Sequence, residues 1–182
     1  MPPGLQFAPD IVSVDEERTL IELAASLPLH EARYKDYTAR RRVYAFGGPA
    51  DDAAPGHRMA PPVHALPPAL QQLRDRLAKW AGIAARDVVH VMVAEYQTGT
   101  PLGWHRDAPH YERIVGVSLG SPARLRLRPW PPQGMQHDDV IALNLAPRSA
   151  YVLAGPARWG WQHSVPPVPG LRYSVTMRTA GR

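Results

Sequence analysis

The sequence predicts a mainly β protein, built as a sandwich or a barrel, and two observations carry this prediction. The chain contains 21 prolines and 14 glycines in 182 residues, and so many breakers disfavour a bundle of long helices and favour short strands joined by turns. From residue 88 onward, six short segments rich in strand-forming residues follow one another with turns between them, which is typical of all-β architectures. The length and the hydrophobic content of 45% suit one domain over residues 1–182.

Two helices are predicted in the first half of the chain. The first covers residues 14–27, where apolar side chains recur at helical spacing and Ser13 with Glu16 forms a capping box. The second covers residues 68–80, where leucines share one face and Gly82 supplies the stop. We expect both helices to support one face of a sheet.

The stretch between the helices, Tyr34 to Pro62, is polar and rich in proline and glycine. We expect it to form either a lid or a solvated loop. The predicted strands follow the second helix. They cover residues 88–96, 113–120, 123–129, 139–145, 149–155 and 172–178.

The composition also limits the class of protein. Without cysteine the chain can form neither disulfides nor thiolate metal sites, so a transition metal has to be bound through histidine and carboxylate side chains. No segment approaches the ~18 consecutive apolar residues of a membrane span, and the first residues lack the pattern of a signal peptide. We therefore expect a cytoplasmic monomer without membrane contact.

The net charge of +5 and the pI of about 9.9 favour binding to a polyanion, because each neutralised phosphate releases condensed counterions. Among the 21 basic residues only Lys35 and Lys79 are lysines, so the arginine bias also fits an effect of genomic base composition. The charge alone leaves nucleic acid as one candidate partner.

The candidate chemistry lies in the segment from Gly103 to Asp107. His105 and Asp107 are two residues apart, so in an extended segment their side chains point to the same side and can bind one metal ion. His163, in a turn-rich stretch before the final strand, would supply a third ligand. Two imidazoles and one carboxylate on one face of an octahedron form the facial triad of non-haem Fe(II) oxygenases, which leaves positions for a co-substrate and O₂.

Two arginines extend this prediction. Alternation in the last predicted strand places Arg172, Ser174, Thr176 and Arg178 on one face. Two arginines inside a barrel are costly unless anions pair with them. A dicarboxylate co-substrate is such an anion, because an arginine fork matches a carboxylate in bidentate geometry. The alternative is that this polar face is turned to solvent.

Four segments then occur in one order: AEYQTGTPLGWHRDAP, IVGVSLGSPARLRLRP, WQHSVPPVPG and RYSVTMR. With them, residues 92–178 resemble the catalytic core of the AlkB family of Fe(II)/2-oxoglutarate-dependent dioxygenases. The resemblance implies a double-stranded β-helix, the jelly-roll or cupin-like fold, with the two helices buttressing one sheet and residues 30–65 as a substrate-recognition lid. It also implies Fe(II), 2-oxoglutarate and O₂ as cofactor and co-substrates.

Carried over position by position, the resemblance assigns iron binding to His105, Asp107 and His163. Arg172 would pair with the distal carboxylate of 2-oxoglutarate, and Tyr96 would donate its hydroxyl to the same co-substrate.

Arg178 matches a second family arginine, near the iron and the inner carboxylate of 2-oxoglutarate, and is the candidate catalytic residue. Ser174 joins the co-substrate residues at a position where the family often carries asparagine, and Ala94 stands where the family often carries another. These departures imply weaker co-substrate binding than is usual in the family. Pro109 replaces an acidic residue that the DNA-repair branch uses near the base, so base preference does not transfer.

Trp104, Tyr44 and Arg41 are the candidate substrate residues. Trp104 either stacks on a flipped base or packs within the protein. In the lid candidate, Tyr37, Tyr44 and Phe46 alternate with basic residues. This mixture suits stacking and phosphate contact, or else the aromatics fold the loop over the barrel.

Two further groups are expected to serve the structure. Arg124, Arg126 and Arg128 alternate with leucines, which predicts a solvated outer face of that strand. Trp159 and Trp161 precede His163 and are expected to pack around it.

Three functions fit these observations. The first is oxidative demethylation of alkylated bases in DNA or RNA, as in DNA repair, with release of succinate, CO₂ and formaldehyde. The second keeps iron and 2-oxoglutarate but acts on a modified tRNA, a protein side chain or a small molecule, because the core sets the chemistry and the lid sets the choice. The third is a binding module that recognises nucleic acid without turnover.

Overall fold

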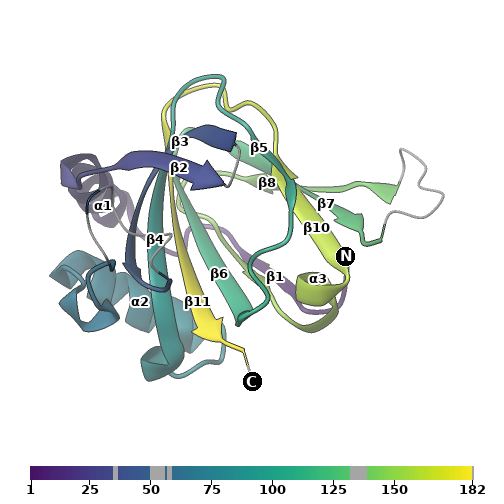
Figure 1. Ribbon diagram of the computed structural model, residues 1–182, viewed down its shortest axis with the longest axis horizontal. Coiled ribbons are helices and arrows are strands. Elements are labelled where there is room, and N and C mark those ends of the chain that lie inside the picture. Colours follow the sequence, from purple (N-terminus) through teal and green to yellow (C-terminus); the bar gives the residue numbers. More distant parts are fainter. Residues whose placement is uncertain (35–36, 50–55, 57–58, 132–138, 182) are drawn as a thin grey trace.

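Two antiparallel sheets packed face to face form the body of the protein in the computed structural model, which describes residues 1–34, 37–49, 56, 59–131 and 139–181. The larger sheet has the strand order β1-β9-β6-β11-β4-β3-β2, and the smaller sheet has the order β5-β10-β7-β8 (Figure 1). Sheets that cover each other and exchange strands along the sequence form a jelly roll. The predicted mainly β jelly-roll fold is confirmed.

The elements are short, as the frequent prolines and glycines predict. The strands are β1 Leu5–Ala8, β2 His30–Tyr34, β3 Tyr37–Gly47, β4 Val88–Tyr96, β5 Leu102–His105, β6 Tyr111–Gly120, β7 Ala123–Pro129, β8 Ile141–Leu145, β9 Ala150–Leu153, β10 Trp161–Val165 and β11 Arg172–Ala180. The helices are α1 Val14–Ser26, α2 Pro68–Trp80 and α3 Gly155–Trp159, with single 3₁₀ turns at Val63–Ala65 and Ala85–Asp87. Among the residues that the structure describes, no helix is long and apolar enough to span a membrane.

Helix α1 begins at the predicted capping box. The backbone nitrogen of Glu16 donates to Ser13 Oγ, and the Glu16 carboxylate accepts from the backbone nitrogen of Ser13 at 2.7 Å. The carboxylate of the next residue, Glu17, accepts hydrogen bonds from the backbone of Gly120 at 2.8 Å and from Arg148 Nη1 at 3.1 Å. These bonds attach the polar start of the helix to the end of β6.

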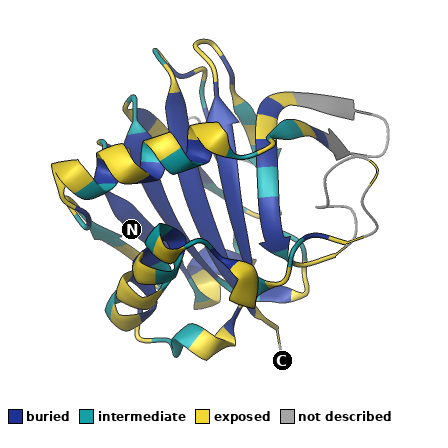
Figure 2. Cartoon of the chain, turned by 90° about the vertical axis from the view of Figure 1, so that its left-hand side faces the viewer, coloured by how far each residue is buried: buried dark blue, intermediate teal, exposed yellow. Residues whose placement is uncertain are grey.

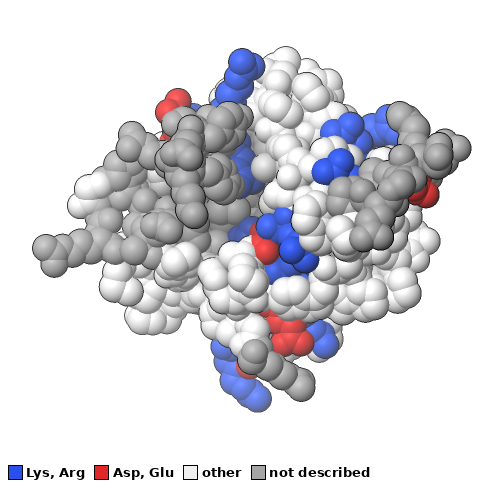
Figure 3. Space-filling model, turned by 45° about the vertical axis from the view of Figure 1, so that its right-hand side comes forward, with Lys and Arg blue, Asp and Glu red and all other residues white. Residues whose placement is uncertain are grey.

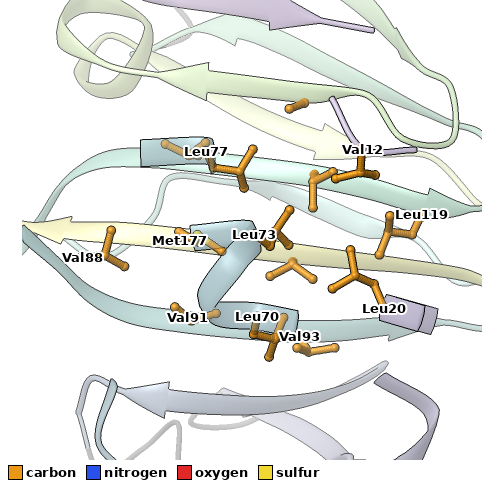
Figure 4. Packing of buried hydrophobic residues seen from close by; sticks show 14 of the residues in the cluster. Val12, Leu20, Leu70, Leu73, Leu77, Val88, Val91, Val93, Leu119 and Met177 are labelled. Atoms are coloured by element: carbon orange, nitrogen blue, oxygen red, sulfur yellow. The ribbon is translucent and has the colours of Figure 1, made fainter. Parts of the chain in front are cut away.

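Helices α1 and α2 cover one face of the larger sheet and turn their exposed sides outward (Figure 2). Leu70, Leu73 and Leu77 project from α2 onto β4 and β11, where they meet Val91, Met177 and their neighbours (Figure 4). Leucines three and four residues apart share one side of a helix, which is why this short helix buries so much apolar surface. The prediction that two helices buttress one sheet is confirmed.

A second apolar cluster fills the space between the sheets. Leu125, Leu127 and Leu145 from the smaller sheet face Met92 and Ile114 from the larger one. The side chains alternate along each strand, so one face of the larger sheet contacts the helices and the other contacts the smaller sheet. The interior of the jelly roll is therefore the second face.

The structure corrects the prediction of a loop between Tyr34 and Pro62. Residues 37–47 form β3, which pairs with β4 in the larger sheet, while most of 50–58 lies outside the described residues. Arginines at positions 40–42 hid this strand, because charged residues are uncommon in a sheet. Arg42 is accommodated by Glu95 on β4, with Nε 2.8 Å from Oε1. The role of residues 30–65 as a lid stays a prediction.

The structure also corrects the turn-rich assignment around His163. Residues 161–165 form β10, which lies between β5 and β7 in the smaller sheet. Gly160 before it and Pro166 and Pro167 after it gave the segment the composition of a turn.

Candidate active site

Two strands of the smaller sheet bring three metal-binding side chains together. His105 ends β5, Asp107 follows two residues later, and His163 lies in the middle of β10. His163 is the register partner of His105, and their ring centroids are 4.2 Å apart. The candidate ligand atoms of all three side chains lie within 4.8 Å of one another. One ion can therefore bind all three.

Hydrogen bonds orient these ligands. His105 Nδ1 lies 2.9 Å from the carbonyl oxygen of Gly103. Because a carbonyl oxygen can only accept, Nδ1 carries the proton and Nε2 is left for a metal. Arg178 donates to Asp107 Oδ1 from Nε at 3.1 Å and from Nη2 at 2.7 Å. Asp107 Oδ2 then faces His163, with 3.7 Å between Oδ2 and Nε2.

The protonation states of the three side chains suit metal binding. The pKa of His163 is lowered to about 3, first by burial and then by the neighbouring His105. Burial is also the main cause that lowers the pKa of His105. For Asp107, burial opposes ionisation, but the charge of Arg178 and the two histidines outweigh it and hold the pKa well below its usual range. Neutral imidazoles and an ionised carboxylate are the forms that bind a metal.

Arg172 presents a buried positive charge to the same cavity. Its residue is 2% exposed, its Nε donates to Ser118 Oγ at 2.9 Å, and its guanidinium lies 4.8 Å from the centre of the Tyr96 ring. Its Nη1 has no hydrogen-bond partner among the described residues. Because a buried donor without an acceptor is costly, an anionic ligand such as a carboxylate fits this position.

Tyr96 lies beside this charge at the end of β4. Arg41 Nη1 approaches the Tyr96 hydroxyl to 3.4 Å. Burial raises the pKa of Tyr96, but the charges of Arg41 and Arg172 outweigh this effect and the pKa is lowered. Ser174 and Ala94, the two departures from the family pattern, are register partners on the cavity face of β11 and β4. The arginines, and not the usual amide side chains, therefore dominate this end of the cavity.

One cavity contains every residue predicted to bind the metal or the co-substrate. It is lined by His105, Asp107, His163, Tyr96, Arg172, Ser174 and Arg178, and also by Arg41 and Tyr151. Its inner end is thus cationic, and its metal-binding end carries the one ionised carboxylate of the described lining.

The three candidate substrate residues lie in three different parts of the structure. Trp104 adjoins His105 in β5, so its side chain points to the opposite, outer face, where it contacts Arg126 and Arg128. This position argues against stacking on a base held at the metal-binding end. Tyr44 lies on the helix face of β3, with its ring 5.3 Å from Phe46, so it does not reach the cavity. The side chain of Tyr37 lies outside the described ones.

Arg41, the third candidate substrate residue, does reach the cavity. It is 6% exposed and shares the cavity face of β3 with Val43 and Ala45. Its position beside Tyr96 places it with the co-substrate residues rather than with an exposed lid.

Sequence reasoning missed His90 and Arg158. His90 is buried on β4 opposite Arg178, and its Nδ1 lies 2.9 Å from Arg178 Nη1. The alternation of β4 could have found it, because His90 shares its face with Tyr96. Arg158, from the unpredicted α3, donates through Nη2 to the carbonyl oxygens of Asp107, Ala108 and Tyr111 at 2.8–3.1 Å. No local signal marks this second residue, because its acceptors lie in a distant loop.

Sequence reasoning also missed Tyr151 of β9. Its ring lies against Gly116 of β6, where a Cβ atom would be 2.5 Å from the ring. Glycine at this position therefore makes room for Tyr151 on the cavity face. Burial raises the pKa of the Tyr151 hydroxyl to about 12, so this group stays protonated and can donate a hydrogen bond inside the cavity.

The two tryptophans near His163 differ. Trp161 points inward on β10 and packs on the apolar cluster between the sheets, so its packing around His163 stays a prediction. Trp159 is 41% exposed, with its ring 4.3 Å from the guanidinium of Arg158. The expectation that it packs around His163 is wrong, because α3 turns it outward.

Comparisons of the chain with known proteins agree with this geometry. A family model described as the 2OG-Fe(II) oxygenase superfamily matches residues 5–178. An uncharacterised protein of Acanthamoeba polyphaga mimivirus is 25% identical over 170 residues, which cover 90% of this chain and 73% of the viral protein. An Arabidopsis thaliana protein named as an alkylated DNA repair protein, ALKBH8 homolog, is 26% identical over 182 residues, which cover 90% of this chain and 51% of that protein.

Solved structures share the fold. The structure titled OsALKBH1 superposes with a TM-score of 0.74 at 15% identity and covers 98% of this chain and 99% of its own. A Pseudomonas putida prolyl-4-hydroxylase superposes with a TM-score of 0.65 at 15% identity and covers 98% of this chain and 93% of its own.

The family match, the jelly-roll fold and the His105, Asp107 and His163 cluster lead to one assignment. The donor set fits Fe(II), and the buried Arg172 nitrogen fits a carboxylate of 2-oxoglutarate. The resemblance to the AlkB family is confirmed, and the chain belongs to the 2OG-Fe(II) oxygenase superfamily as an AlkB-like oxidoreductase that uses Fe(II), 2-oxoglutarate and O₂.

Proposed function

We propose that the protein removes alkyl groups oxidatively from nucleic-acid bases. The observation that carries this proposal is the relationship to the Arabidopsis thaliana protein, which is named as an alkylated DNA repair protein and matches 90% of this chain. The chain spans about half of that relative's length, 51%, so the proposal concerns the oxygenase domain that the two share. The net charge of +5 supports a polyanionic substrate.

The residues of the cavity divide the work between them. His105, Asp107 and His163 would hold Fe(II), and Arg178 keeps the Asp107 carboxylate in place through two hydrogen bonds.

At the other end of the cavity, Arg172 would bind the distal carboxylate of 2-oxoglutarate in a charge-assisted hydrogen bond. Tyr96 and Ser174 would contact the same co-substrate, and Arg41, beside the Tyr96 hydroxyl, would add a second positive charge. We infer that Arg41 offsets the absence of the family's asparagines at positions 94 and 174.

The chemistry that bound iron supplies is a coupled oxidation, in which 2-oxoglutarate loses CO₂ and takes one oxygen atom of O₂ to become succinate, while the other oxygen atom enters a substrate C–H bond. On an N-methyl group the hydroxylated product is a hemiaminal. Its C–N bond then breaks, which releases formaldehyde and returns a proton to the base nitrogen. The buried residues around the cavity hold the reacting carbon in place and exclude water.

The first test is anaerobic reconstitution with Fe(II) and 2-oxoglutarate, followed by exposure to air. We expect a weak visible charge-transfer band, then succinate, in the wild-type protein and neither in His105→Ala. An exposed histidine variant, His110→Ala, is the matched control and should retain both. Absence of band and succinate in the wild type, with Fe(II) shown to be bound, would contradict the co-substrate assignment.

The second test addresses the substrate. Oligonucleotides that carry N-methylated bases should yield formaldehyde in step with succinate, and the unmethylated oligonucleotides should not. If succinate forms but no methylated DNA or RNA yields formaldehyde, the substrate belongs to another class, such as a modified tRNA, a protein side chain or a small molecule. The proposed cytoplasmic monomer is checked by fractionation and by analytical ultracentrifugation.

A further inference from the structure

The outer face of the smaller sheet carries an unusual set of side chains. Alternation along β5, β7 and β10 turns His105, Leu127 and His163 inward and their neighbours outward. The outward side chains define what we term the arginine–tryptophan face: Trp104, Arg124, Arg126, Arg128 and Gln162, continued beyond the strands by Arg106 and Trp130. Ser164 has the same orientation but is fully buried.

Two arginines of this face lie over one indole. The guanidinium of Arg128 is 4.4 Å from the centre of the Trp104 ring, and that of Arg126 is 5.1 Å from it. Each guanidinium is oriented by a neighbour on β10, since Arg128 Nε donates to Gln162 at 2.8 Å and Arg126 Nε donates to Ser164 at 3.1 Å. These bonds are made by the Nε atoms and not by the Nη atoms.

The same arrangement occurs once more on this side of the molecule. The guanidinium of Arg106 lies 5.3 Å from the centre of the Trp130 ring, and its Nη1 donates to the carbonyl oxygen of Trp159 at 3.1 Å. Trp130 is 38% exposed. Two separate arginine–indole pairs therefore offer flat, partly exposed surfaces next to positive charge.

Within the part of the chain that the structure describes, Arg126 and Arg128 take part in no salt bridge. None of the four strands of the smaller sheet contains an aspartate or a glutamate. By contrast, Arg18 and Arg74 on the helices each pair with an aspartate. Figure 3 shows Lys and Arg side chains at several separate places of this view, one of them at the upper right.

The geometry points to a single-stranded nucleic acid as the occupant of the arginine–tryptophan face. Unpaired bases stack on indole and guanidinium planes, and the Nη atoms bind phosphate oxygens. A duplex keeps its bases stacked internally and offers no base plane to such a surface. This inference rests on the proposed function, because it assigns the face to the strand that carries the alkylated base.

The position of the face relative to the active site supports this assignment. Trp104 directly precedes His105, and β5 is one of the two edge strands of the smaller sheet. The outer face and the cavity side therefore meet at β5. Nucleotides held at Trp104 belong to the segment that flanks the nucleotide inserted into the cavity.

The test compares two double variants that lose the same charge. Arg126→Gln with Arg128→Gln alters the face, and Arg18→Gln with Arg74→Gln is the matched control on the far side of the larger sheet. Binding of a labelled, unmodified single-stranded 12-nucleotide DNA is followed by fluorescence anisotropy over a series of KCl concentrations. Decarboxylation of 2-oxoglutarate without a second substrate is measured in parallel, because it reports the intact active site.

We expect the face variant to raise the Kd about tenfold or more at low salt and to reduce the slope of log K against log salt by about 1.4, because each lost phosphate contact contributes ~0.7 on a single strand. The control variant should keep the slope within about 0.3 of the wild type. Trp104→Leu should raise the Kd about fivefold or more and Trp104→Phe less, since stacking depends on the ring. Basal decarboxylation should be unchanged in both double variants.

Three results would overturn the inference in distinguishable ways. Equal Kd and slope for the face variant and the wild type would contradict the role of the arginine–tryptophan face in binding. The demethylase proposal would then still be tested by the formaldehyde assay. If polyglutamate of matched charge competes as well as the oligonucleotide, the occupant of the face is an acidic polypeptide and not a nucleic acid. If the wild-type protein decarboxylates 2-oxoglutarate but binds no oligonucleotide, both this inference and the proposed substrate class are contradicted.

Discussion

The nine residues of β11 alternate between two faces of the sheet, and the two faces differ in what they contribute to the protein. Tyr173, Val175 and Met177 point to the helices and belong to the apolar core. Arg172 and Arg178 alternate with them, point into the jelly roll and are 2% and 7% exposed. A strand can carry both sets because successive side chains point to opposite faces.

One face of β11 mainly stabilises the fold, and the other face mainly serves the active site. The helix face contributes through apolar area removed from water. The cavity face holds buried charges, whose cost is offset in part by the pairing of Arg178 with Asp107 and would be offset further by a bound anion. Substitutions on the helix face should therefore change the free energy of unfolding, and substitutions on the cavity face should change the use of metal and co-substrate.

The largest expected effect is on the helix face. Leu77 is 0% exposed in α2, and Leu77→Ala should lower the free energy of unfolding by about 2–5 kcal/mol through lost burial and a cavity. Urea unfolding measures this change, and Leu171→Ala, at a side chain 46% exposed, should cost less than about 0.5 kcal/mol. A raised KM for 2-oxoglutarate in folded Leu77→Ala would show that the two faces are coupled.

On the cavity face, Arg172→Gln should raise the KM for 2-oxoglutarate by roughly 10- to 150-fold, the equivalent of about 1.5–3 kcal/mol for a hydrogen bond to a charged group. Arg172→Lys should recover part of this loss, because it keeps the charge but not the planar fork. Steady-state succinate production measures the effect. The free energy of unfolding should not fall, and a large decrease would mean that Arg172 serves the fold and not the co-substrate.

A smaller effect is expected at His90, which acts through Arg178. His90→Asn should weaken metal binding about 3- to 10-fold, at or below the range found for residues that support a ligand, because Arg178 then holds Asp107 less firmly. Titration with Co(II) under anaerobic conditions gives the affinity. His110→Ala is the exposed control, and an unchanged Co(II) affinity in His90→Asn would exclude the positioning role.

The smallest effect concerns the start of α1, on the helix side. The pKa of Glu16 is lowered to about 2, first by its hydrogen bond with Arg76. Because the folded pKa lies below the ordinary value, the stabilisation is complete above about pH 4.5 and is lost as the pH falls through about 2. Glu16→Gln should cost about 0.5–1 kcal/mol at pH 7, since the pair is partly exposed to solvent.

The pH series for this variant uses urea unfolding of wild type and Glu16→Gln from pH 7 to pH 2. The difference between them should shrink below pH 4.5. A difference that is constant over this range would show that the Glu16 hydrogen bonds, and not its charge, stabilise the helix start.

Local patterns predicted many elements well. Helix α2 and strands β4 and β7 have the predicted bounds, because leucines at helical spacing and alternating apolar residues are signals contained within each segment. The spacing of His105 and Asp107 is also local, so the sequence predicted that they share a side. The alternation of β5 placed Trp104 on the other side, and the same rule applied to Trp104 would have predicted its outer position.

The sequence by itself determined the mainly β class, the two buttressing helices and the identity of the residues that gather at the metal-binding end. Only the tertiary structure decided that the arginine-rich segment 37–47 is a strand, that Arg41 lies in the cavity, and that His90 and Arg158 support the site. The physical reason is that a buried arginine or histidine is stabilised by partners far away in the chain, such as Glu95 for Arg42. Those partners become neighbours only when the sheets assemble.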